Sequence, residues 1–448
     1  MRHPGICLLL LLNLTTTGTS DSFAQNPIIR DQFTADPSAR VFGDSVYLYP
    51  SHDIPATAGR GRPGWFCMED YHVFSSGNLT DWLDHGVIVN QESVPWVNSK
   101  VFAMWAPDCV SKNGKYYFYF PAPAKDGAFG RGFAIGVAVS DNPDGPFTPQ
   151  LEPIKNVHGI DPCVLIDKDG QAYLYWAMGR LSVAKLKENM LELESEPQVI
   201  QGLPDKGLKE GPFVFERNGI YYLIYPHVAD TRERLEYAMS DSPMGPFKVA
   251  GVAMDTTAGC WTNQASVIEF KNQWYLFYHH NDLSPRFDKN RSVRIDSLFF
   301  NEDGTIKKVI PTLRGVGITD ASSRIQIDRY SNVSESGASI AFLDTLKSFD
   351  GWETILDTAQ AWVQYNSVNF GDRRLRSIEL RVRSETGATI ETRLDKVDGP
   401  LIARVKIPKA DEWQTINSRL SEVPVGIHNL VVSLRNDGDI EIDWVSLR

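Results

Sequence analysis

The stretch KEGPFVFERNGIYYLIY, residues 209–225, combines an acidic residue, a tight turn and two strands in one short unit. Glu210 stands just before the apolar run FVF, and Asn218-Gly219 separates that run from the aromatic run YYLIY. Asn-Gly between two such runs is typical of a β-hairpin. The stretch therefore predicts an acid placed at the start of a hairpin.

The same unit recurs along the chain, and regular recurrence is the signature of a repeat architecture. Four further copies are DPSARVFGDSVYLYPS from residue 36, WAPDCVSKNGKYYFYF from 105, DPCVLIDKDGQAYLYW from 161 and QASVIEFKNQWYLFYH from 264. In each copy the lead residue precedes a tyrosine of the returning strand by 11 positions, or by 12 in the copy from residue 161; these are Tyr47, Tyr116, Tyr173, Tyr221 and Tyr275. The chain thus contains five copies of one hairpin.

A second repeat follows the first. FSSGNLTDW (74–82), AVSDNPDGPF (138–147) and AMSDSPMGPF (238–247) have the pattern of one outer strand and its turn. The lead positions of the first repeat are 49 to 69 residues apart, which suits about four short strands in each unit. Four-stranded units repeated radially form a β-propeller, so the sequence predicts five blades.

The lead residues are the candidate site. The innermost strand of each propeller blade runs beside the central axis, so equivalent positions of all blades converge. A single acid there is also typical of a strand start or a turn cap. Three acids at one register favour a functional site, because buried carboxylates cost free energy unless something uses them. The residues expected to meet are Asp36, Trp105, Asp161, Glu210 and Gln264.

Composition limits the partners of this site. The 448 residues predict two domains, and 42% hydrophobic with 11% aromatic residues indicates a globular protein. A formal net charge of −11 argues against a nucleic-acid partner, which requires Lys and Arg to neutralise phosphates. Carboxylates around a sugar-sized space can instead hydrolyse a glycoside, one protonating the leaving oxygen and another activating water or attacking the anomeric carbon. Trp105 offers an apolar platform for a sugar ring.

The N-terminus predicts export. Residues 1–24 have the basic start, the short apolar run and the small-residue cleavage site Ser22-Phe23-Ala24 of a signal peptide, and no stretch is long enough to span a membrane. We therefore expect a secreted or periplasmic protein. Its cysteines form either disulfides or buried free thiols, and they are Cys67, Cys109, Cys163 and Cys260.

The hairpin repeats end near Thr312, and short alternating strands follow a linker at 312–324. The predicted division is a signal peptide at 1–24, a five-bladed propeller at 25–314 and a β-sandwich of jelly-roll type at 322–448. The fold class is therefore all-β.

Over roughly residues 27–315 the chain resembles glycoside hydrolase family 43. The resemblance rests on FTADPSARV, WAPD, GIDPCV, KEGPFVF, TNQASVIEF and RSVRIDSLFFNEDGTI. It implies a five-bladed propeller that hydrolyses glycosides with inversion. It also implies that Asp36 is the general base and Glu210 the general acid. Asp161 would hold the acid in place and keep its pKa high through like-charge repulsion.

The resemblance also assigns residues around these acids. Trp105 would line the sugar subsite, and Arg291 would hydrogen-bond the sugar or the acid, with a surface ion pair as the alternative. Many relatives have a histidine at the position of Gln264 that helps to hold a metal ion or a water cluster. A Gln amide is a weaker ligand, so we expect no required cofactor, and a structural calcium is left open. His279 and His280 follow the fifth hairpin, as pocket or structural residues.

The first blade contains a long segment at 51–72 that the sequence predicts to be a loop at the pocket rim. Ser51, His52 and Asp53 begin it, and Trp65 and Phe66 are expected to close one end of the cleft. A closed end favours release of single terminal sugars.

The C-terminal segment resembles a carbohydrate-binding module of family 6. The resemblance rests on WVQYNSVNFG (362–371), ATIETRLDKVDGPLIARVKIP (388–408), DEWQTI (411–416) and the closing IEIDWVSLR. Relatives often have Glu where Gln326 stands and Asn near Glu441, so the module either binds sugar or only packs on the propeller. A family-type calcium would use Asp328 and Asp443.

These observations predict an inverting glycoside hydrolase that releases pentose, first of all α-L-arabinofuranosyl, from arabinoxylan or arabinan. β-Xylosidase, β-galactofuranosidase and endo-arabinanase activities stay open. A non-catalytic sugar-binding propeller is the alternative, against which the complete set Asp36, Asp161 and Glu210 argues. The expected partner is a plant cell-wall oligosaccharide or polysaccharide. We expect the protein to be a monomer, to bind no nucleic acid and to have no membrane span.

Overall fold

Every regular element of the described chain is a β-strand or a single turn of 3-10 helix, at Gln91–Ser93 and Ser348–Asp350. The computed structural model describes residues 25–125, 132–228, 230–372 and 374–448. The predicted signal peptide at 1–24 lies outside these residues. Within them, no helix has the length and apolar character needed to cross a bilayer.

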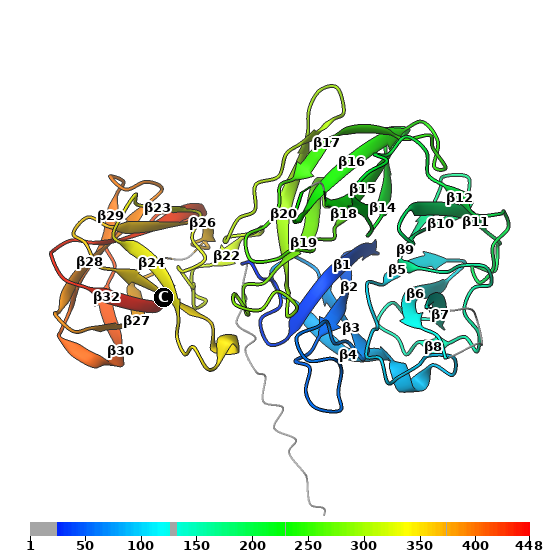
Figure 1. The fold of residues 1–448 in the computed structure, drawn as a ribbon. Coiled ribbons are helices and arrows are strands. Elements are labelled where there is room, and N and C mark those ends of the chain that lie inside the picture. Colours follow the sequence, from blue (N-terminus) through cyan, green and yellow to red (C-terminus); the bar gives the residue numbers. More distant parts are fainter. Residues whose placement is uncertain (1–24, 126–131, 229, 373) are drawn as a thin grey trace, which may run out of the picture.

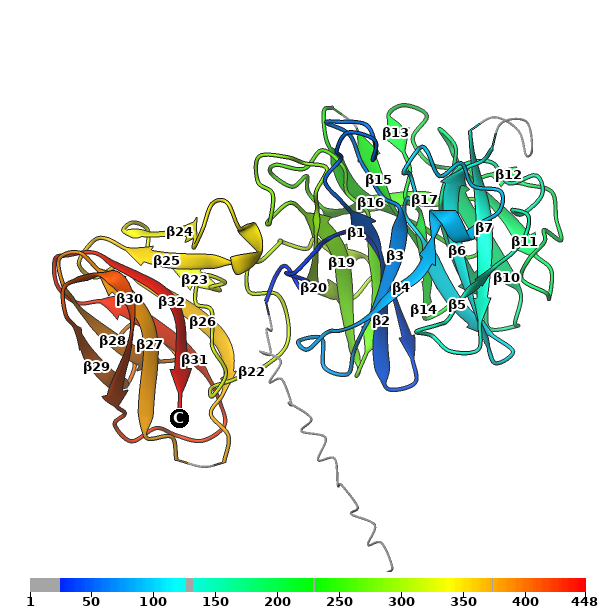
Figure 2. The ribbon, with the colours of Figure 1, turned by 90° about the horizontal axis from the view of Figure 1, so that it is seen from below.

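The first part of the chain forms five sheets around one axis (Figures 1 and 2). The first two blades are β1 (Phe33–Phe42), β2 (Ser45–Asp53), β3 (Asp70–Ser76) and β4 (Leu83–Asn90), then β5 (Asp108–Lys112), β6 (Lys115–Pro123), β7 (Phe133–Ser140) and β8 (Thr148–Pro149). The third is β9 (Ile160–Ile166), β10 (Ala172–Ala177), β11 (Leu181–Leu186) and β12 (Gln198–Val199). The fourth is β13 (Leu208–Lys209), β14 (Phe213–Arg217), β15 (Ile220–Val228), β16 (Glu233–Ser240) and β17 (Lys248–Met254). The fifth is β18 (Ser266–Phe270), β19 (Gln273–His280), β20 (Ser292–Phe300) and β21 (Ile306–Lys307).

The inner strands close the propeller. β1, β5, β9, β14 and β18 contact one another in sequence, and β18 contacts β1 again. In the fourth blade, β14 and β15 pair in the predicted hairpin, with Arg217 opposite Ile220. Asn218 and Gly219 both have positive φ, at 54° and 83°, as a two-residue hairpin turn requires. The predicted five-bladed propeller is confirmed.

The second repeat proves to be a docking point between blades. The hydroxyl of Tyr49 on β2 donates to the carbonyl of Pro143, and the hydroxyl of Tyr175 on β10 donates to the carbonyl of Pro243, at 2.5 and 2.6 Å. Each tyrosine thus hydrogen-bonds the outer turn of the following blade. Its ring is fully buried, so the contact satisfies a polar group inside the apolar layer between blades.

The structure decides between disulfides and free thiols for the four cysteines. Among the described residues, Cys67, Cys109, Cys163 and Cys260 are all buried and all free. They pack as small apolar side chains rather than forming disulfides.

The C-terminal part is a two-sheet sandwich. One sheet is β22 (Thr319–Asp320), β26 (Trp362–Asn369), β31 (Ile427–Leu434), β28 (Ala388–Leu394) and β29 (Leu401–Ile407), with β23 (Asn332–Val333) beside β26. The other is β24 (Ala338–Phe342), β25 (Trp352–Leu356), β32 (Ile440–Leu447), β27 (Ser377–Ser384) and β30 (Ala410–Arg419). Alternate residues of the facing strands form one apolar core, which confirms the predicted sandwich.

The sandwich packs on the propeller through a small apolar cluster. Phe33 and Leu283 of the propeller contact Trp352 of β25. The guanidinium groups of Arg30 and Arg329 lie over the Trp352 ring, 5.0 and 3.8 Å from its centroid. The indole is therefore a shared anchor between the two units.

Two residues predicted to matter for ligands of the module make contacts at this junction. The Oε1 atom of Gln326 accepts a 2.6 Å hydrogen bond from Arg30. The buried Asp328 pairs at 2.5 Å with Arg329. Arg329 in turn lies 3.7 Å from Asp282 of the propeller. These side chains join the two units.

Candidate active site

Two strand bulges place the predicted aspartates. In β1, Ala35 pairs with Ser51 and Ser38 with Tyr49, so two residues face one on the partner strand. The same irregularity occurs in β9 around Asp161. Asp36 and Asp161 have φ of 45° and 56°, in the left-handed region where Asp is among the tolerated residues. Such bulges redirect a side chain, and here they turn both carboxyls toward the axis.

Glu210 stands one residue before the position that Asp36 and Asp161 occupy in their own blades. In the fourth blade the left-handed position before the proline is Gly211, at φ 51°, so Gly211 and not Glu210 is equivalent to the two aspartates. A Cβ on Gly211 would lie 2.9 Å from Pro226 and 3.1 Å from Gln264. Only glycine fits there, and the longer Glu side chain extends from the preceding residue. The prediction of one shared register is wrong by one residue for Glu210, and by the same amount for Trp105, because Ala106 is the residue before the proline in the second blade.

The five lead residues do converge. A cavity of about 180 Å³ is lined by Asp36, Trp65, Phe66, Met68, Trp105, Ala106, Ile160, Asp161, Glu210, Trp261, Thr262, Asn263, Gln264 and Arg291. Pockets for drug-sized ligands occupy about 300–1,000 Å³, so this cavity suits one sugar unit. Its wall is largely apolar, and the carboxyls of Asp36, Asp161 and Glu210 are part of it.

Asp36 is held as a carboxylate. Arg291 donates to its Oδ1 at 2.7 Å and Ser51 donates to its Oδ2 at 2.8 Å. Burial disfavours the charged carboxylate, but the charge of Arg291 and these hydrogen bonds outweigh it and hold the pKa of Asp36 below its ordinary value. Asp36 is therefore suited to accept a proton at neutral pH.

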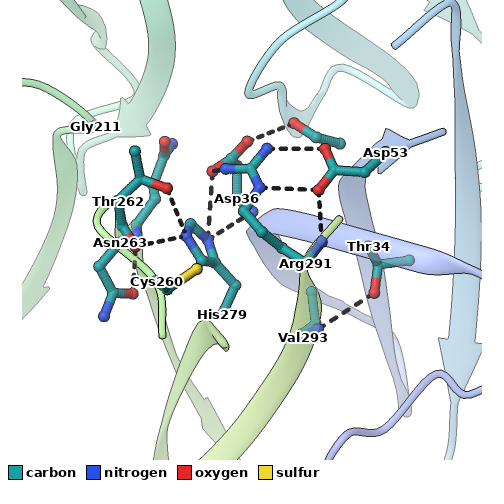
Figure 3. Close-up of polar contacts among 12 residues, drawn as sticks. Thr34, Asp36, Asp53, Gly211, Cys260, Thr262, Asn263, His279, Arg291 and Val293 are labelled. Atoms are coloured by element: carbon teal, nitrogen blue, oxygen red, sulfur yellow. Dashed lines mark hydrogen bonds and ion pairs between the residues drawn. The ribbon is translucent and has the colours of Figure 1, made fainter. Parts of the chain in front are cut away.

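Arg291 is oriented by a second carboxylate. Its Nε and Nη2 atoms donate to both oxygens of Asp53 at 2.9 Å, and its backbone N–H donates to Asp53 Oδ2 at 2.8 Å (Figure 3). The side chain is 3% exposed, which excludes the surface ion pair. Ser51 and Asp53 were predicted to begin a rim loop, yet they end β2 and support the base and its arginine.

His279 fixes the backbone of the base. Its Nδ1 accepts the Asp36 N–H at 3.2 Å, so its Nε2 carries the hydrogen and donates to the Thr262 carbonyl at 3.0 Å. Burial, followed by the charge of Arg291, lowers the pKa of His279 to about 3. The fully buried, neutral imidazole is a structural residue, which decides between the two sequence alternatives for His279.

Three further carboxyls, those of Asp161, Glu210 and Glu233, interact with one another. Asp161 Oδ2 accepts the Gly211 N–H at 2.9 Å and so holds the backbone next to Glu210. Burial and then the charge of Glu210 raise the pKa of Asp161 well above its ordinary value. Burial and then the charge of Asp36 raise the pKa of Glu210. A carboxyl that keeps its proton at higher pH is the equipment of a general acid.

Glu233 is the third member, and the sequence analysis missed it. It is 1% exposed, lies within hydrogen-bonding reach of Glu210, and accepts the Asn263 N–H at 2.6 Å. Burial and then the charge of Glu210 raise its pKa well above the ordinary value. Glu233 is the first residue of β16, which lies outside the repeated hairpin, so the repeat gave no signal for it.

Glu233→Gln is expected to move the alkaline limit of kcat/KM to higher pH. The hydrogen bond with Glu233 stabilises the Glu210 carboxylate and lowers the pKa of Glu210, and an amide is a weaker donor than a carboxylic acid. The Gln oxygen still accepts the Asn263 N–H, so the maximum should fall by less than about 10-fold, well below the loss on removing a general acid. Measured pH profiles of both proteins test this.

Glu236→Gln is the matched control, because Glu236 is equally buried on β16 but pairs with Arg234 and His227. Its profile should keep the wild-type alkaline limit. An unchanged limit in the Glu233 variant would remove Glu233 from the coupled group.

The remaining predicted residues line the cavity. Trp105 is partly buried and stacks on Phe133, with ring centroids 4.5 Å apart. Gln264 contacts the position of Gly211 from the fifth blade. Trp65 and Phe66 lie at the cavity as predicted, and the Arg291 guanidinium is 4.8 Å from the Phe66 ring centroid. The 51–72 segment therefore supplies one wall.

Further along the inner strands the axis is filled by an ion pair. Arg40 donates to both oxygens of Asp108 at 2.9 and 2.6 Å. Ser38 and the Val164 N–H also donate to Asp108, each at 2.6 Å. Blades one, two and three are thereby joined behind the cavity.

These side chains do not fit a calcium ion at the axis. Ca²⁺ takes about six to eight oxygen ligands. Gln264 offers one amide oxygen, both nitrogens of His279 are engaged, and Arg40 and Arg291 bring positive charge.

The two predicted calcium ligands of the sandwich, Asp328 and Asp443, do not fit a calcium ion either. Asp443 pairs with Arg381, and Asp328 pairs with Arg329. Each carboxylate is paired with a guanidinium group, which takes the place that a cation would need.

Family profiles agree with this architecture. The profile of glycosyl hydrolases family 43 matches residues 24–306, more than half of the chain. The chain belongs to glycoside hydrolase family 43. The profile of carbohydrate binding module family 6 matches residues 334–448. This family 43 protein is thus a glycosidase, and its two units both point to carbohydrate as the partner.

Curated relatives cover different shares of the family 43 chain. A xylosidase/arabinosidase of Humicola insolens is 38% identical over 62% of this chain and 98% of its own length. An arabinoxylan arabinofuranohydrolase of Bacillus subtilis is 29% identical over 95% of this chain and 94% of its own. The second alignment spans both units.

Solved structures give the same picture. A β-xylosidase/α-arabinofuranosidase from a compost metagenome, solved with xylotriose in a calcium-free form, has a TM-score of 0.58 and 35% identity over 64% of this chain and 98% of its own. The Bacillus subtilis arabinoxylan arabinofuranohydrolase with cellotetraose has a TM-score of 0.56 and 25% identity over 95% of this chain and 97% of its own.

Proposed function

We propose that this protein is an inverting, exo-acting glycosidase that releases single pentose residues, α-L-arabinofuranosyl first, from arabinoxylan or arabinan. The observation that carries the proposal is the small cavity lined by Asp36, whose pKa is lowered, and by Asp161 and Glu210, whose pKa values are raised. The names of the relatives, xylosidase/arabinosidase and arabinoxylan arabinofuranohydrolase, support the sugar class.

Asp36 acts as the general base. Its carboxylate takes a proton from a water molecule, whose oxygen attacks the anomeric carbon from the face opposite the leaving group. Arg291 and Ser51 hold both carboxylate oxygens, and His279 holds the backbone, so the base is fixed before substrate arrives.

Glu210 acts as the general acid. It donates its proton to the glycosidic oxygen as the bond to the anomeric carbon breaks, and the resulting carboxylate is re-protonated from solvent. Asp161 positions it through the Gly211 N–H. Burial and the charge of Asp36 disfavour loss of the Glu210 proton, because additional negative charge is costly in a buried site.

The cavity supports exo action. Trp65 and Phe66 of the long first-blade segment form one wall, and the volume suits one sugar unit. A linear polysaccharide needs an open groove for internal cleavage, so this shape favours removal of a terminal or side-chain sugar over endo-arabinanase activity.

β-Xylosidase activity is the second candidate, favoured by the relatives whose names join both activities. A galactofuranosidase of Aspergillus niger at 32% identity keeps a third sugar open. Release of sugar from arabinosides, xylosides and galactofuranosides, with the product identified, separates the three.

The stereochemical proposal has a direct test. Proton NMR of the first product, before mutarotation, should show the anomer of inverted configuration. Retained configuration would contradict Asp36 as a general base, and absence of turnover on all three sugar classes would favour the non-catalytic propeller.

Two expectations from the sequence remain proposals. Export to the periplasm or the medium rests on the signal-like residues 1–24. For the sandwich we propose a packing role on the propeller, supported by the contacts of Gln326 with Arg30 and of Trp352 with Phe33.

A further inference from the structure

One face of the first blade gathers four ionisable side chains away from the catalytic cavity. Leu48 of β2 lies opposite Phe74 of β3, and Phe74 lies opposite Asp84 of β4. Side chains alternate along a strand, so His72 shares the face of Phe74 and His52 shares the face of Leu48. Three neighbouring strands thus present His52, Asp70, His72 and Asp84 on one side of the sheet.

The contacts within this group form two imidazole–carboxylate pairs. His52 Nδ1 lies 2.6 Å from Asp70 Oδ1, and His72 Nδ1 lies 3.0 Å from both oxygens of Asp84. The two rings are 4.8 Å apart between centroids. One ligand atom each of His52, Asp70 and His72 lies within 4.8 Å of the other two.

We propose that His52, Asp70 and His72 bind a Zn²⁺ ion. Two imidazoles and one carboxylate are a ligand set that zinc accepts, with water in the fourth position. The ion would take the place of the proton between His52 Nδ1 and Asp70, and His72 would bind through its Nε2.

The second carboxylate strengthens this assignment. A histidine that binds a metal usually donates its other N–H to a carboxylate, which fixes the ring and raises its basicity. Asp84 stands in that relation to the Nδ1 atom of His72. Gln32 in turn donates to Asp84 at 3.0 Å, while its buried Oε1 has no hydrogen-bond partner among the described residues.

The movement required is small. Zinc bonds of about 2.0–2.2 Å in a tetrahedron place ligand atoms about 3.3 Å apart. His52 and Asp70 must separate slightly and His72 must approach. Their side chains retain some exposure, 17%, 11% and 16%, so they are not locked in a dense core.

The site lies behind the general base but outside the catalytic cavity. His52 stands between Ser51 and Asp53 on β2, whose side chains point to Asp36 and Arg291 on the other face. A bound ion would link β2 to β3 and stabilise the first blade, without contacting substrate.

Zinc titration of the chelator-treated full-length protein tests the proposal. We expect calorimetry to show one bound Zn²⁺ per chain and a higher Tm with zinc. His52→Gln and His72→Gln should weaken binding by more than 100-fold. Asp84→Asn should keep the stoichiometry and weaken binding by about 10- to 100-fold, as loss of such a partner typically does.

His85→Gln is the matched control. His85 lies on the same blade and approaches Asp144 at 3.4 Å and Ser75 at 2.7 Å, but among the described residues it belongs to no group of three metal-ligating side chains. The His85→Gln variant should bind zinc with the affinity of the wild-type protein. Glycoside turnover confirms folding of each variant, and Asp84→Asn carries the test if a histidine variant does not fold. The proposal is overturned if wild type shows no saturable site, or if loss of His52, His72 or Asp84 leaves zinc affinity unchanged.

Discussion

Glu210→Gln is expected to lower kcat/KM on a natural arabinoside or xyloside by roughly 10²- to 10⁴-fold, the usual contribution of a general acid. An aryl glycoside with a good leaving group should lose far less, because its departing phenolate needs no proton. Gln keeps the size of the side chain and removes only the proton that Glu210 donates. Parallel kinetics on the two substrates measure the difference.

Glu216→Gln provides a control from the same hairpin. Glu216 lies on β14, pairs with Lys168 and the Gly219 N–H, and stays outside the cavity. Its variant should match wild type on both substrates. If Glu210→Gln loses activity equally on both, Glu210 does not act as the acid.

Sequence periodicity predicted the site because the propeller repeats its inner strand. Asp36 and Asp161 recur before a proline at equivalent bulges, so their convergence follows from the repeat alone. Glu210 was found for the same reason, although Gly211 takes the strained position. Local repeats thus predict where side chains meet, to within one residue.

The supporting residues were beyond this reasoning. Asp53 and Glu233 lie on β2 and β16, outside the repeat units, whereas His279 on β19 ends the fifth unit and its role was left open. Their roles arise from contacts between residues up to 255 positions apart, as between Arg291 and Asp36. Such contacts depend on how blades one and five close the ring, which a single sequence does not state.

The division of labour between the acids also needed the structure. Their residue types are the same, but one guanidinium decides their protonation: Arg291 contacts Asp36 directly, whereas Asp161 and Glu210 face other carboxyls. The surroundings of Asp36 therefore favour the carboxylate, and those of Asp161 and Glu210 favour the carboxylic acid. That contrast is the physical basis for separate base and acid roles.

Asp36→Asn is expected to abolish hydrolysis of both substrate types together, by roughly 10²- to 10⁴-fold or more. Attack by water needs a base whatever the leaving group, so a good leaving group cannot compensate. The Asn oxygen can still accept the Arg291 hydrogen bond, and Arg291 keeps its paired contact with Asp53. The fold should persist, which the Tm verifies.

Ser51→Ala separates the charge of Asp36 from its orientation. It removes the 2.8 Å hydrogen bond to Asp36 Oδ2 but leaves the carboxylate and Arg291 in place. We expect a loss of no more than about 10-fold in kcat/KM, in line with one hydrogen bond of about 1 kcal/mol. The acidic limit should also move to higher pH, because that hydrogen bond helps to hold the pKa of Asp36 down.

The Asp36→Asn prediction is contradicted by substantial hydrolysis on either substrate, which would place the base elsewhere in the cavity.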